Sequence, residues 1–458
     1  MSPDRARSPE DELARWRAVG EEEHPLHVGS LRVFDAIPRV DEIERRVAAR
    51  VAADARLSEP PARSPIAAAL RLDTTPSDRR ASRVERVTLP RPSDEAALAQ
   101  AIGEAWSRPL PFDRRWQLVL LDGLPRGGAL LLAKAHLSLF DEAGGIDLLD
   151  LLLGRGGEGT TAVVPEVVTV REAGGDAPAR RGGLGEIVAA ARGALDLLTP
   201  EVARERAMEA ALWFESAMRV VASPAPETPL NGSLGRGRRI AWARLCRDVV
   251  RGIEESVGAS TGEVVLAVVG DALGRHLARR GRSTSNLDLD VLVRTCSDRD
   301  RGTIVPLPVA GRSLRERTRA IRRSRHEPAA RERRERLDRV LDAALSLPAP
   351  ARSAAANLAW QSVNTVCIEA RDSALDQVGG LRPRLVVPVA PLPWNVGLAV
   401  AWHDAGHEIV IGLAVDTRLV PDPEAIATAL RAAATEAAAE AGVPAVDPLQ
   451  RPDLAALG

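Results

Sequence analysis

Two apolar runs joined by a short turn constrain the fold of this chain more than any other feature. Trp116–Leu121 and Ala129–Ala135 are each long enough for a strand. Between them, Asp122–Gly128 is rich in Gly, with one Asp and one Pro, as expected of a tight connection between paired strands. The segment therefore predicts two neighbouring strands of one sheet.

Strand and helix patterns also alternate before this pair. His27–Phe34 and Val84–Leu89 have the patterns of strands, and Arg39–Ala53 carries apolar residues at helical spacing. A further helix is expected from Ser93, with Ser93 as its cap and acidic residues in its first turn. The first third of the chain is therefore predicted to be α/β.

The second half repeats this alternation. Strands are predicted at Arg238–Ala243, Val291–Val293, Ile304–Val309, Val363–Ile368, Leu385–Pro388, Val396–Trp402 and Ile409–Val415. Helices are predicted at Leu245–Val257, Ser260–Arg279, Arg312–Leu347 and Pro423–Ala441. Strands and helices therefore alternate in both halves, which predicts the α/β fold class.

A chain of 458 residues is longer than one hydrophobic core usually organises. We expect a first domain at residues 1–160 and a second at residues 230–458. The segment between them, 161–229, begins rich in Gly, Pro and Glu and then becomes helical, so we interpret it as a connector.

Composition excludes several classes of partner. The net charge of -1 gives no general attraction to nucleic acid or to an anionic membrane. Arg312–Arg339 is basic, but interleaved acids and the lack of aromatic residues favour a solvated helix face over a nucleic-acid site. No apolar run reaches the roughly 18 residues of a membrane span, and the N-terminus lacks a secretory signal pattern.

Metal and disulfide sites are not indicated either. The cysteines number 3 and are far apart, which argues against a disulfide framework and fits a cytoplasmic location. Asp288 and Asp290 resemble a metal-binding pair, but we place them in a linker with no third ligand nearby. His403 and His407 flank a turn sequence, which predicts a hairpin with two surface histidines.

The segment that follows the second apolar run carries the most specific pattern. It reads Lys134-Ala-His-Leu-Ser-Leu-Phe-Asp-Glu-Ala-Gly-Gly145 and resembles the acyl-transfer motif H-H-x-x-x-D-G of the wax ester synthase/diacylglycerol acyltransferase family. Lys134 and the two glycines fix the alignment. His136 then takes the position of the first histidine, and Leu137 takes that of the second.

The resemblance assigns roles to these positions. In the family the second histidine is the general base that takes the proton of the acceptor hydroxyl, and Leu137 cannot do so. Asp141 stands for the structural aspartate, and Glu142 replaces the glycine. Loss of a positioned base costs on the order of 10²–10⁴ in rate. In a regular strand His136 would face away from Leu137, as a structural histidine; a bend at the strand end would instead let it act as a substitute base.

Resemblance to the family extends along nearly the whole chain. Segments similar to family sequences are His24–Phe34, Ser107–Leu110, Asp122–Pro125, Leu230–Arg239, Gly379–Leu381 and Leu419–Pro423. Two functional segments differ: Gly262-Glu263 replaces an Asn-Asp pair, and Asn364–Arg371 replaces Asn-Val-Pro-Gly-Pro. The framework is thus more similar to the family than the functional segments are.

The resemblance implies a chloramphenicol acetyltransferase-like fold of two α/β domains, each with a mixed sheet and helices, with an active-site channel between the domains. It leaves three hypotheses open. The first is an acyl-CoA-dependent O-acyltransferase that makes triacylglycerol or wax esters, with His136 or an unusual partner as base. The second is a catalytically silent homologue that binds lipid, acyl-CoA or a partner enzyme. The third is condensation of thioester-bound acyl groups. Acyl-CoA is expected as substrate rather than as cofactor, no cofactor is implied, and peripheral attachment to membranes or lipid droplets follows only from the resemblance.

Overall fold

The computed structural model describes residues 25–54, 57, 84–89, 94–110, 115–124, 127–139, 148–153, 224–295, 302–309, 312–345, 349–371 and 377–444. Asp141, Glu142 and nearly all of the predicted connector 161–229 lie outside these ranges. The described part has two mixed sheets, which confirms the expected α/β class.

The N-terminal sheet has five strands in the order β2-β3-β4-β1-β9. Four of them come from the start of the chain: β1 (His27–Phe34), β2 (Glu85–Thr88), β3 (Trp116–Asp122) and β4 (Ala129–His136). β3 and β4 are antiparallel neighbours, as their apolar runs predicted. The fifth strand, β9 (Leu385–Val389), comes from the second half and pairs antiparallel with β1. The second half of the chain therefore completes the sheet of the first.

The C-terminal sheet has six strands in the order β5-β11-β10-β8-β6-β7. These are β5 (Arg238–Cys246), β6 (Asp288–Arg294), β7 (Thr303–Pro308), β8 (Thr365–Glu369), β10 (Leu398–Asp404) and β11 (Glu408–Asp416). β8 is parallel to β6 and β10, and the other pairs are antiparallel. The β10–β11 hairpin confirms the turn predicted between His403 and His407.

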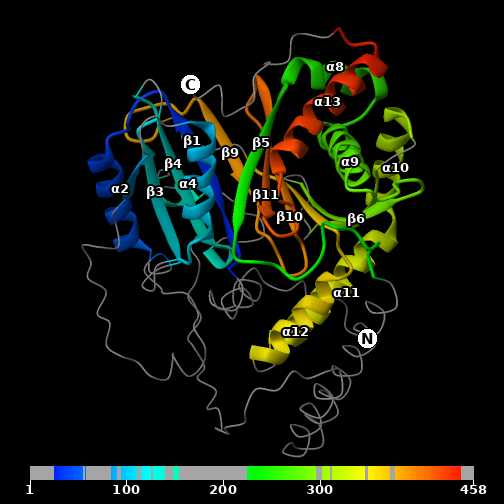
Figure 1. The fold of residues 1–458 in the computed structure, drawn as a ribbon, viewed down its shortest axis with the longest axis horizontal. Coiled ribbons are helices and arrows are strands. Elements are labelled where there is room, and N and C mark those ends of the chain that lie inside the picture. Colours follow the sequence, from blue (N-terminus) through cyan, green and yellow to red (C-terminus); the bar gives the residue numbers. More distant parts are fainter. Residues whose placement is uncertain are drawn as a thin grey trace, which may run out of the picture.

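Helices cover the outer faces of both sheets and fill the space between them (Figure 1). The described helices are α2 (Val40–Ala53), α4 (Glu95–Ser107), the 3₁₀ turn η3 (Leu137–Leu139), α5 (Leu148–Leu153), α8 (Arg247–Val257), α9 (Thr261–Arg279), α10 (Leu314–His326), α11 (Pro328–Leu345), α12 (Ala349–Trp360) and α13 (Pro423–Ala441). α4 is capped by Asp94, whose side chain accepts from the Ala97 amide, so the expected cap at Ser93 is wrong by one residue.

Three apolar clusters hold these layers together. One lies between the two sheets and joins α4, α11 and α12 to residues of both. A second packs α8, α9, α10 and α13 on the C-terminal sheet, and a third packs α2 and α5 on the N-terminal sheet. The first cluster contains Trp106 of α4 and Trp242 of β5, so the two halves share a core.

Two helix and loop predictions in the second half need correction. The single helix expected over Arg312–Leu347 is two helices, because Glu327 ends α10 and Pro328 begins α11, where its missing amide proton costs nothing. Its basic face is only partly solvated, since Arg317 is buried and lies 2.7 Å from Asp271.

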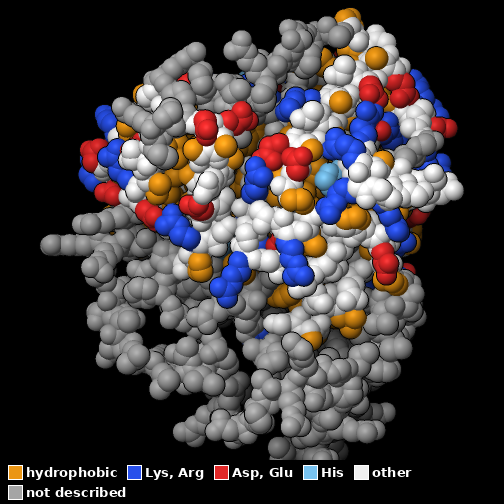
Figure 2. All heavy atoms as spheres, in the orientation of Figure 1, with side chains coloured by type: hydrophobic (Ala, Val, Ile, Leu, Met, Phe, Trp, Pro, Cys, Tyr) orange, Lys and Arg blue, Asp and Glu red, His pale blue; other side chains and the backbone are white. Residues whose placement is uncertain are grey.

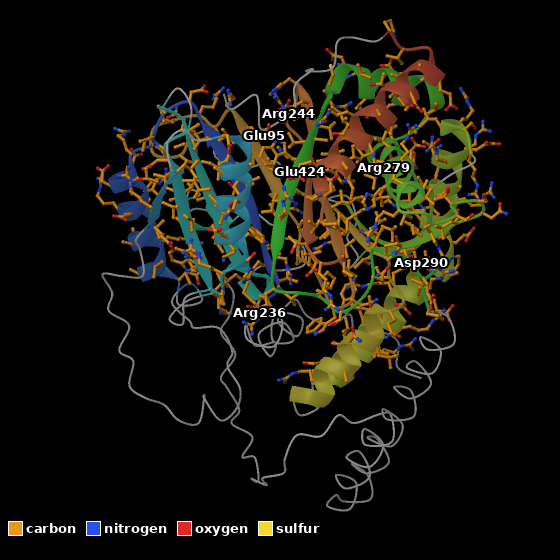
Figure 3. The ribbon with its side chains drawn as sticks, in the orientation of Figure 1. Glu95, Arg236, Arg244, Arg279, Asp290 and Glu424 are labelled. Atoms are coloured by element: carbon orange, nitrogen blue, oxygen red, sulfur yellow. The ribbon has the colours of Figure 1, made fainter. Side chains whose placement is uncertain are left out.

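Asp288 and Asp290 belong to β6 rather than to a linker. Asp290 accepts from Arg333 of α11 at 2.5 Å, at the foot of the sheet (Figure 3). Burial raises the pKa of the Asp290 carboxyl, and Arg333 opposes that rise. This pair therefore ties α11 to β6.

Acidic and basic side chains are interleaved over the face seen in Figure 2. Within the described ranges, no single helix is long and apolar enough to span a bilayer. α8 and α9 together reach the required length and composition, but they meet at a bend of 100°.

Candidate functional site

Side chains alternate along β4 between the core shared by the sheets and the outer core under α2 and α5. Leu130 and Leu132 belong to the shared core, whereas Leu131 and Ala133 belong to the outer one. The same alternation places Lys134 and His136 on the side of the shared core. The predicted motif therefore begins where the N-terminal sheet faces the second half.

Lys134 is fully buried at the C-terminal end of α4. Its ammonium donates to the carbonyl oxygens of Ala105 at 2.9 Å, Trp106 at 3.4 Å and Arg108 at 2.5 Å. These carbonyls lie at the helix end, which carries partial negative charge, so a cation is favoured there. Lys134 thus fastens α4 to the strand that carries the motif.

His136 ends β4 and is 1% exposed. Its Nδ1 accepts from the Ser138 backbone amide at 3.2 Å and lies 2.9 Å from the Ser138 hydroxyl. Arg115 donates to that hydroxyl oxygen at 2.8 Å, so the hydroxyl proton is directed to Nδ1. Because Nδ1 accepts, a neutral His136 carries its proton on Nε2. This pattern fixes the imidazole and makes its Nδ1 lone pair inaccessible to a substrate.

Leu137 lies just past the strand, as the first residue of η3. Its amide donates to the Leu26 carbonyl at 2.9 Å, which leaves the side chain packed against the core between the sheets. Regular strand alternation therefore does not extend from His136 to Leu137. At the position of the family's general base stands an aliphatic side chain that contacts the shared core.

A second buried histidine lies directly across the strand pair. His27 of β1 is the register partner of His136. The next pair along, Leu26 and Leu137, is hydrogen-bonded through the Leu137 amide, so His27 and His136 form a non-hydrogen-bonded pair, whose side chains come closest. His27 Nδ1 lies 3.2 Å from the Trp106 carbonyl, and a carbonyl only accepts, so Nδ1 carries the proton. The sequence predicted the strand but gave no sign of this pairing.

Gly262-Glu263, which replaces the family's Asn-Asp pair, has a structural explanation. Glu263 closes a capping box with Ser260 at the start of α9. Arg322 of α10 donates to both carboxylate oxygens, at 2.8 and 2.6 Å. Burial would raise the pKa of Glu263, but the bonds from Arg322 and the Ser260 amide hold it below its ordinary value. The carboxylate that replaces the family's Asn-Asp pair is thus committed to holding α9 and α10 together.

The segment that opens the second half is fixed by an amide network. Asn231 donates to the carbonyls of Val363, Asn364 and Asn395, at 3.0 to 3.3 Å. Asn364 in turn donates to Asn231 Oδ1 at 2.8 Å and accepts from the Asp290 amide. These side chains connect Leu230–Arg239, which resembles the family, to Asn364–Arg371, which differs from it. Their role is therefore structural.

Arg238 continues that framework on β5. Its guanidinium donates to Asp416 at 2.7 Å, and both side chains are buried. Its backbone amide donates to the hydroxyl oxygen of Ser107, the last residue of α4, at 2.8 Å. The ion pair therefore stands where α4 meets the C-terminal sheet.

Within the described ranges, no group of three or more His, Cys, Asp or Glu side chains could hold a metal ion. His407 is exposed, as predicted, but the prediction is wrong for His403, which is 4% exposed and lies 2.9 Å from the Val386 carbonyl. That contact links β10 to β9, and so links the two sheets.

Comparison with known proteins agrees with this architecture. Residues 13–265 match the model of the wax ester synthase/diacylglycerol acyltransferase catalytic domain. A Mycobacterium tuberculosis H37Rv protein named "Putative diacyglycerol O-acyltransferase" is 26% identical over 402 residues, covering 86% of this chain and 82% of that protein. A second protein so named from the same strain is 28% identical over 210 residues, covering 43% and 39%.

The fold is also similar to a solved structure. The wax ester synthase/diacylglycerol acyltransferase from Marinobacter aquaeolei VT8 superposes with a TM-score of 0.60 and 18% identity, covering 97% of this chain and 100% of that one. This similarity confirms the expected two-part acyltransferase fold. With the family match over more than half of its length, the chain belongs to the wax ester synthase/diacylglycerol acyltransferase family.

Proposed function

We propose that this protein binds a long-chain acyl thioester between its two sheets and does not transfer the acyl group. The observation that carries the proposal is Leu137 at the position of the general base, with its side chain against the core shared by the sheets. Acyl transfer to an alcohol needs a group that removes the hydroxyl proton as the thioester is attacked. An isobutyl group has no lone pair for that proton.

The state of His136 supports the same proposal. Its Nδ1 accepts from the Ser138 amide, and its Nε2 carries the proton in the neutral form. A neutral imidazole in this arrangement can donate a hydrogen bond but cannot take a proton at either nitrogen without losing the Ser138 contact. His136 therefore stabilises the turn into η3 in this proposal, as a structural residue.

One observation favours a second candidate function, in which acyl transfer is retained. The Nδ1 proton of His27 is held by the Trp106 carbonyl, so its Nε2 is the acceptor nitrogen, on the same side of the sheet as His136. A carbonyl-oriented imidazole is a common form of general base. In this candidate His27 takes the proton in place of the missing second histidine.

A variant series separates the two functions. Release of free CoA from palmitoyl-CoA is measured with 1-hexadecanol or a diacylglycerol, for the natural protein and for Leu137→His, Leu137→Gln and His27→Gln. The proposal expects no turnover by the natural protein, with turnover appearing in Leu137→His at ~10² times background or more. Leu137→Gln is the matched control, because it is polar and of similar size but cannot take a proton.

Binding is measured on the same proteins. Equilibrium titration with palmitoyl-CoA should give saturable binding by the natural protein, and Leu137→Trp, whose bulkier side chain crowds the core between the sheets, should reduce it. Turnover by the natural protein that His27→Gln abolishes would contradict the silent function and establish the second candidate. Absence of any palmitoyl-CoA binding would contradict both.

A further inference from the structure

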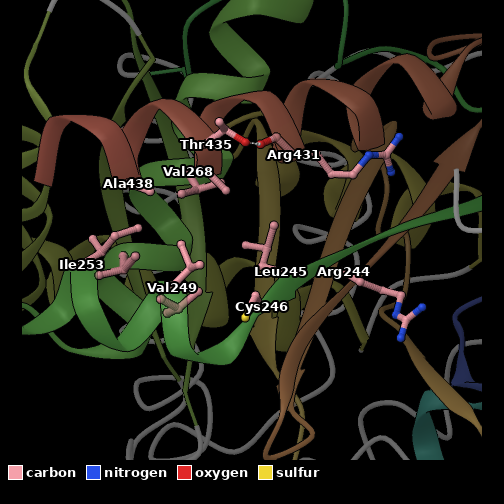
Figure 4. A pocket seen from close by; sticks show the side chains of 12 residues that line it. Arg244, Leu245, Cys246, Val249, Ile253, Val268, Arg431, Thr435 and Ala438 are labelled. Carbon is pink, nitrogen blue, oxygen red and sulfur yellow. Dashed lines mark hydrogen bonds between the residues drawn. The ribbon is translucent and has the colours of Figure 1, made fainter. Parts of the chain in front are cut away.

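The cavity beneath α13 is too small for a lipid. The end of β5, helix α8, and parts of α9 and α13 form its walls (Figure 4). Its volume is about 30 Å³, which is room for water but not for an acyl chain. It lies on the helical side of the C-terminal sheet, whereas Leu137 contacts the core between the sheets. The thioester of the proposed function therefore has to be held at that shared core.

Two buried indole groups in the shared core lack a hydrogen-bond acceptor. Trp242 of β5 is 2% exposed and Trp360, the last residue of α12, is 4% exposed. Both belong to the apolar cluster between the sheets, and neither Nε1 makes a hydrogen bond with any residue that the structure describes. An indole N–H can only donate, and folded proteins rarely leave a buried donor unpaired. Each N–H is therefore a candidate donor to a ligand in this core.

The motif end of the N-terminal sheet lies beside one edge of the C-terminal sheet. Lys134, two residues before His136 on β4, donates to the carbonyl of Arg108 at the end of α4. The neighbouring Ser107 hydroxyl accepts from the amide of Arg238, which is the first residue of β5. By strand register, β11 ends and β10 begins at the same edge as Arg238. The motif and this edge are therefore at the same end of the molecule.

The connection from β9 to β10 places Trp360 at that end. β9 finishes at Val389, whose register partner is Gly29, and the start of β1 lies beside the end of β4. The chain then passes through Asn395 before β10 begins, and Asn395 donates through Nδ2 to the Trp360 carbonyl at 3.4 Å. Trp360 therefore lies at the end of the shared core where Leu137 leaves β4.

Trp242 occupies a different part of the same core. It is four residues from Arg238, which is roughly 13 Å along the strand. Its register partner is Gly412, in the middle of β11. Of the two unpaired indoles, Trp360 is therefore the one at the motif end of the core.

The surroundings of Trp360 favour a neutral acceptor. Ala359, Val363 and Leu392 belong to the same apolar cluster. A carboxylate would be costly to bury among such side chains, whereas a thioester carbonyl is neutral and can accept a hydrogen bond. The rest of an acyl chain is apolar, as this core is.

We propose that the indole N–H of Trp360 donates a hydrogen bond to the carbonyl oxygen of the bound acyl thioester. This inference rests on the proposed function, because it names the group that recognises the thioester there. It makes Trp360 a binding residue. The protein should therefore prefer a thioester to a ligand that has the same chain but no carbonyl.

The preference is measured by equilibrium titration of the full-length protein with palmitoyl-CoA and with S-hexadecyl-CoA, a thioether of the same chain length. The natural protein should bind palmitoyl-CoA about tenfold more tightly, since only the thioester brings an acceptor to the buried donor. Trp360→Phe keeps an aromatic ring without the N–H and should lose this preference. Trp242→Phe removes the other unpaired N–H and, as the control, should keep it.

Infrared spectroscopy of palmitoyl-CoA labelled with ¹³C at its carbonyl reports the same bond directly. The carbonyl stretch should lie at lower wavenumber on the natural protein and on Trp242→Phe than on Trp360→Phe. Equal affinity of the natural protein for the two ligands, or one carbonyl frequency for all three proteins, would overturn this inference and leave the proposed function intact. Binding of neither ligand would contradict the proposed function, and this inference with it.

Discussion

Replacing Lys134 by Met tests whether a buried ammonium fastens α4 beside the motif. Methionine keeps the volume of the stem but cannot donate, so the carbonyls of Ala105 and Arg108 lose their bonds from Nζ, while the Trp106 carbonyl keeps the bond from His27. A buried carbonyl left without a donor costs about 1–3 kcal/mol. The Ala105 carbonyl is buried and the Arg108 carbonyl is partly buried, and their lost bonds, together with the lost interaction at the helix end, outweigh the relief of ammonium desolvation. We expect the free energy of unfolding to fall by about 3 kcal/mol.

Urea unfolding followed by circular dichroism measures this change. With a slope of about 3 kcal/mol per molar urea, the midpoint should fall by roughly 1 M. Arg45→Met is the matched control: this side chain is 76% exposed on α2, and its loss should change the free energy by less than about 0.5 kcal/mol. A loss below about 1 kcal/mol in Lys134→Met would refute the reasoning, because the cost of burying the ammonium would then cancel its bonds.

Two further predictions concern the framework. Gly412→Ala would place a Cβ 1.9 Å from the Pro388 carbonyl oxygen, where β11 meets β9, and should lower the free energy of unfolding, measured in urea, by about 3 kcal/mol. Gly262→Ala, whose Cβ would lie 3.5 Å from Trp402, is the control and should leave that free energy unchanged. Equal effects of the two substitutions would contradict the close approach at Gly412. Glu263→Gln should destabilise the protein at pH 7, with the deficit closing as the pH falls below the ordinary carboxyl pKa of 4.5. The folded-state pKa of Glu263 lies below its ordinary 4.5, so its stabilisation is present above that pH and is lost as the carboxylate protonates. A deficit that does not change between pH 7 and pH 3 would contradict the ion pair with Arg322.

Much of the fold follows from local patterns in the sequence. β1 was predicted to the residue, and the predicted helix over Pro423–Ala441 is α13. The ends of α13 carry strong local signals, with Asp422 before Pro423 and Gly442 after the helix. α12 was missed, because its alanine-rich sequence shows little apolar periodicity.

Long-range pairing could not be predicted from the same patterns. β9 joins β1 across more than three hundred residues, and no local signal specifies which strand edge an apolar run will complete. The contact of His403 with Val386 depends on that placement of β9, and the pairing of His27 with His136 depends on the register of β1 against β4, which no local pattern specifies either. The environment of Leu137 was also unpredictable, since it depends on the strand ending at His136.

We propose that the protein holds an acyl thioester without transferring it. The most direct test mixes the protein, in excess, with palmitoyl-CoA and 1-hexadecanol, and follows the thioester by mass spectrometry over a single turnover. We predict that palmitoyl-CoA stays protein-bound and intact for the natural protein and is consumed by Leu137→His. Conversion of one equivalent of palmitoyl-CoA into free CoA and hexadecyl palmitate by the natural protein would contradict the claim.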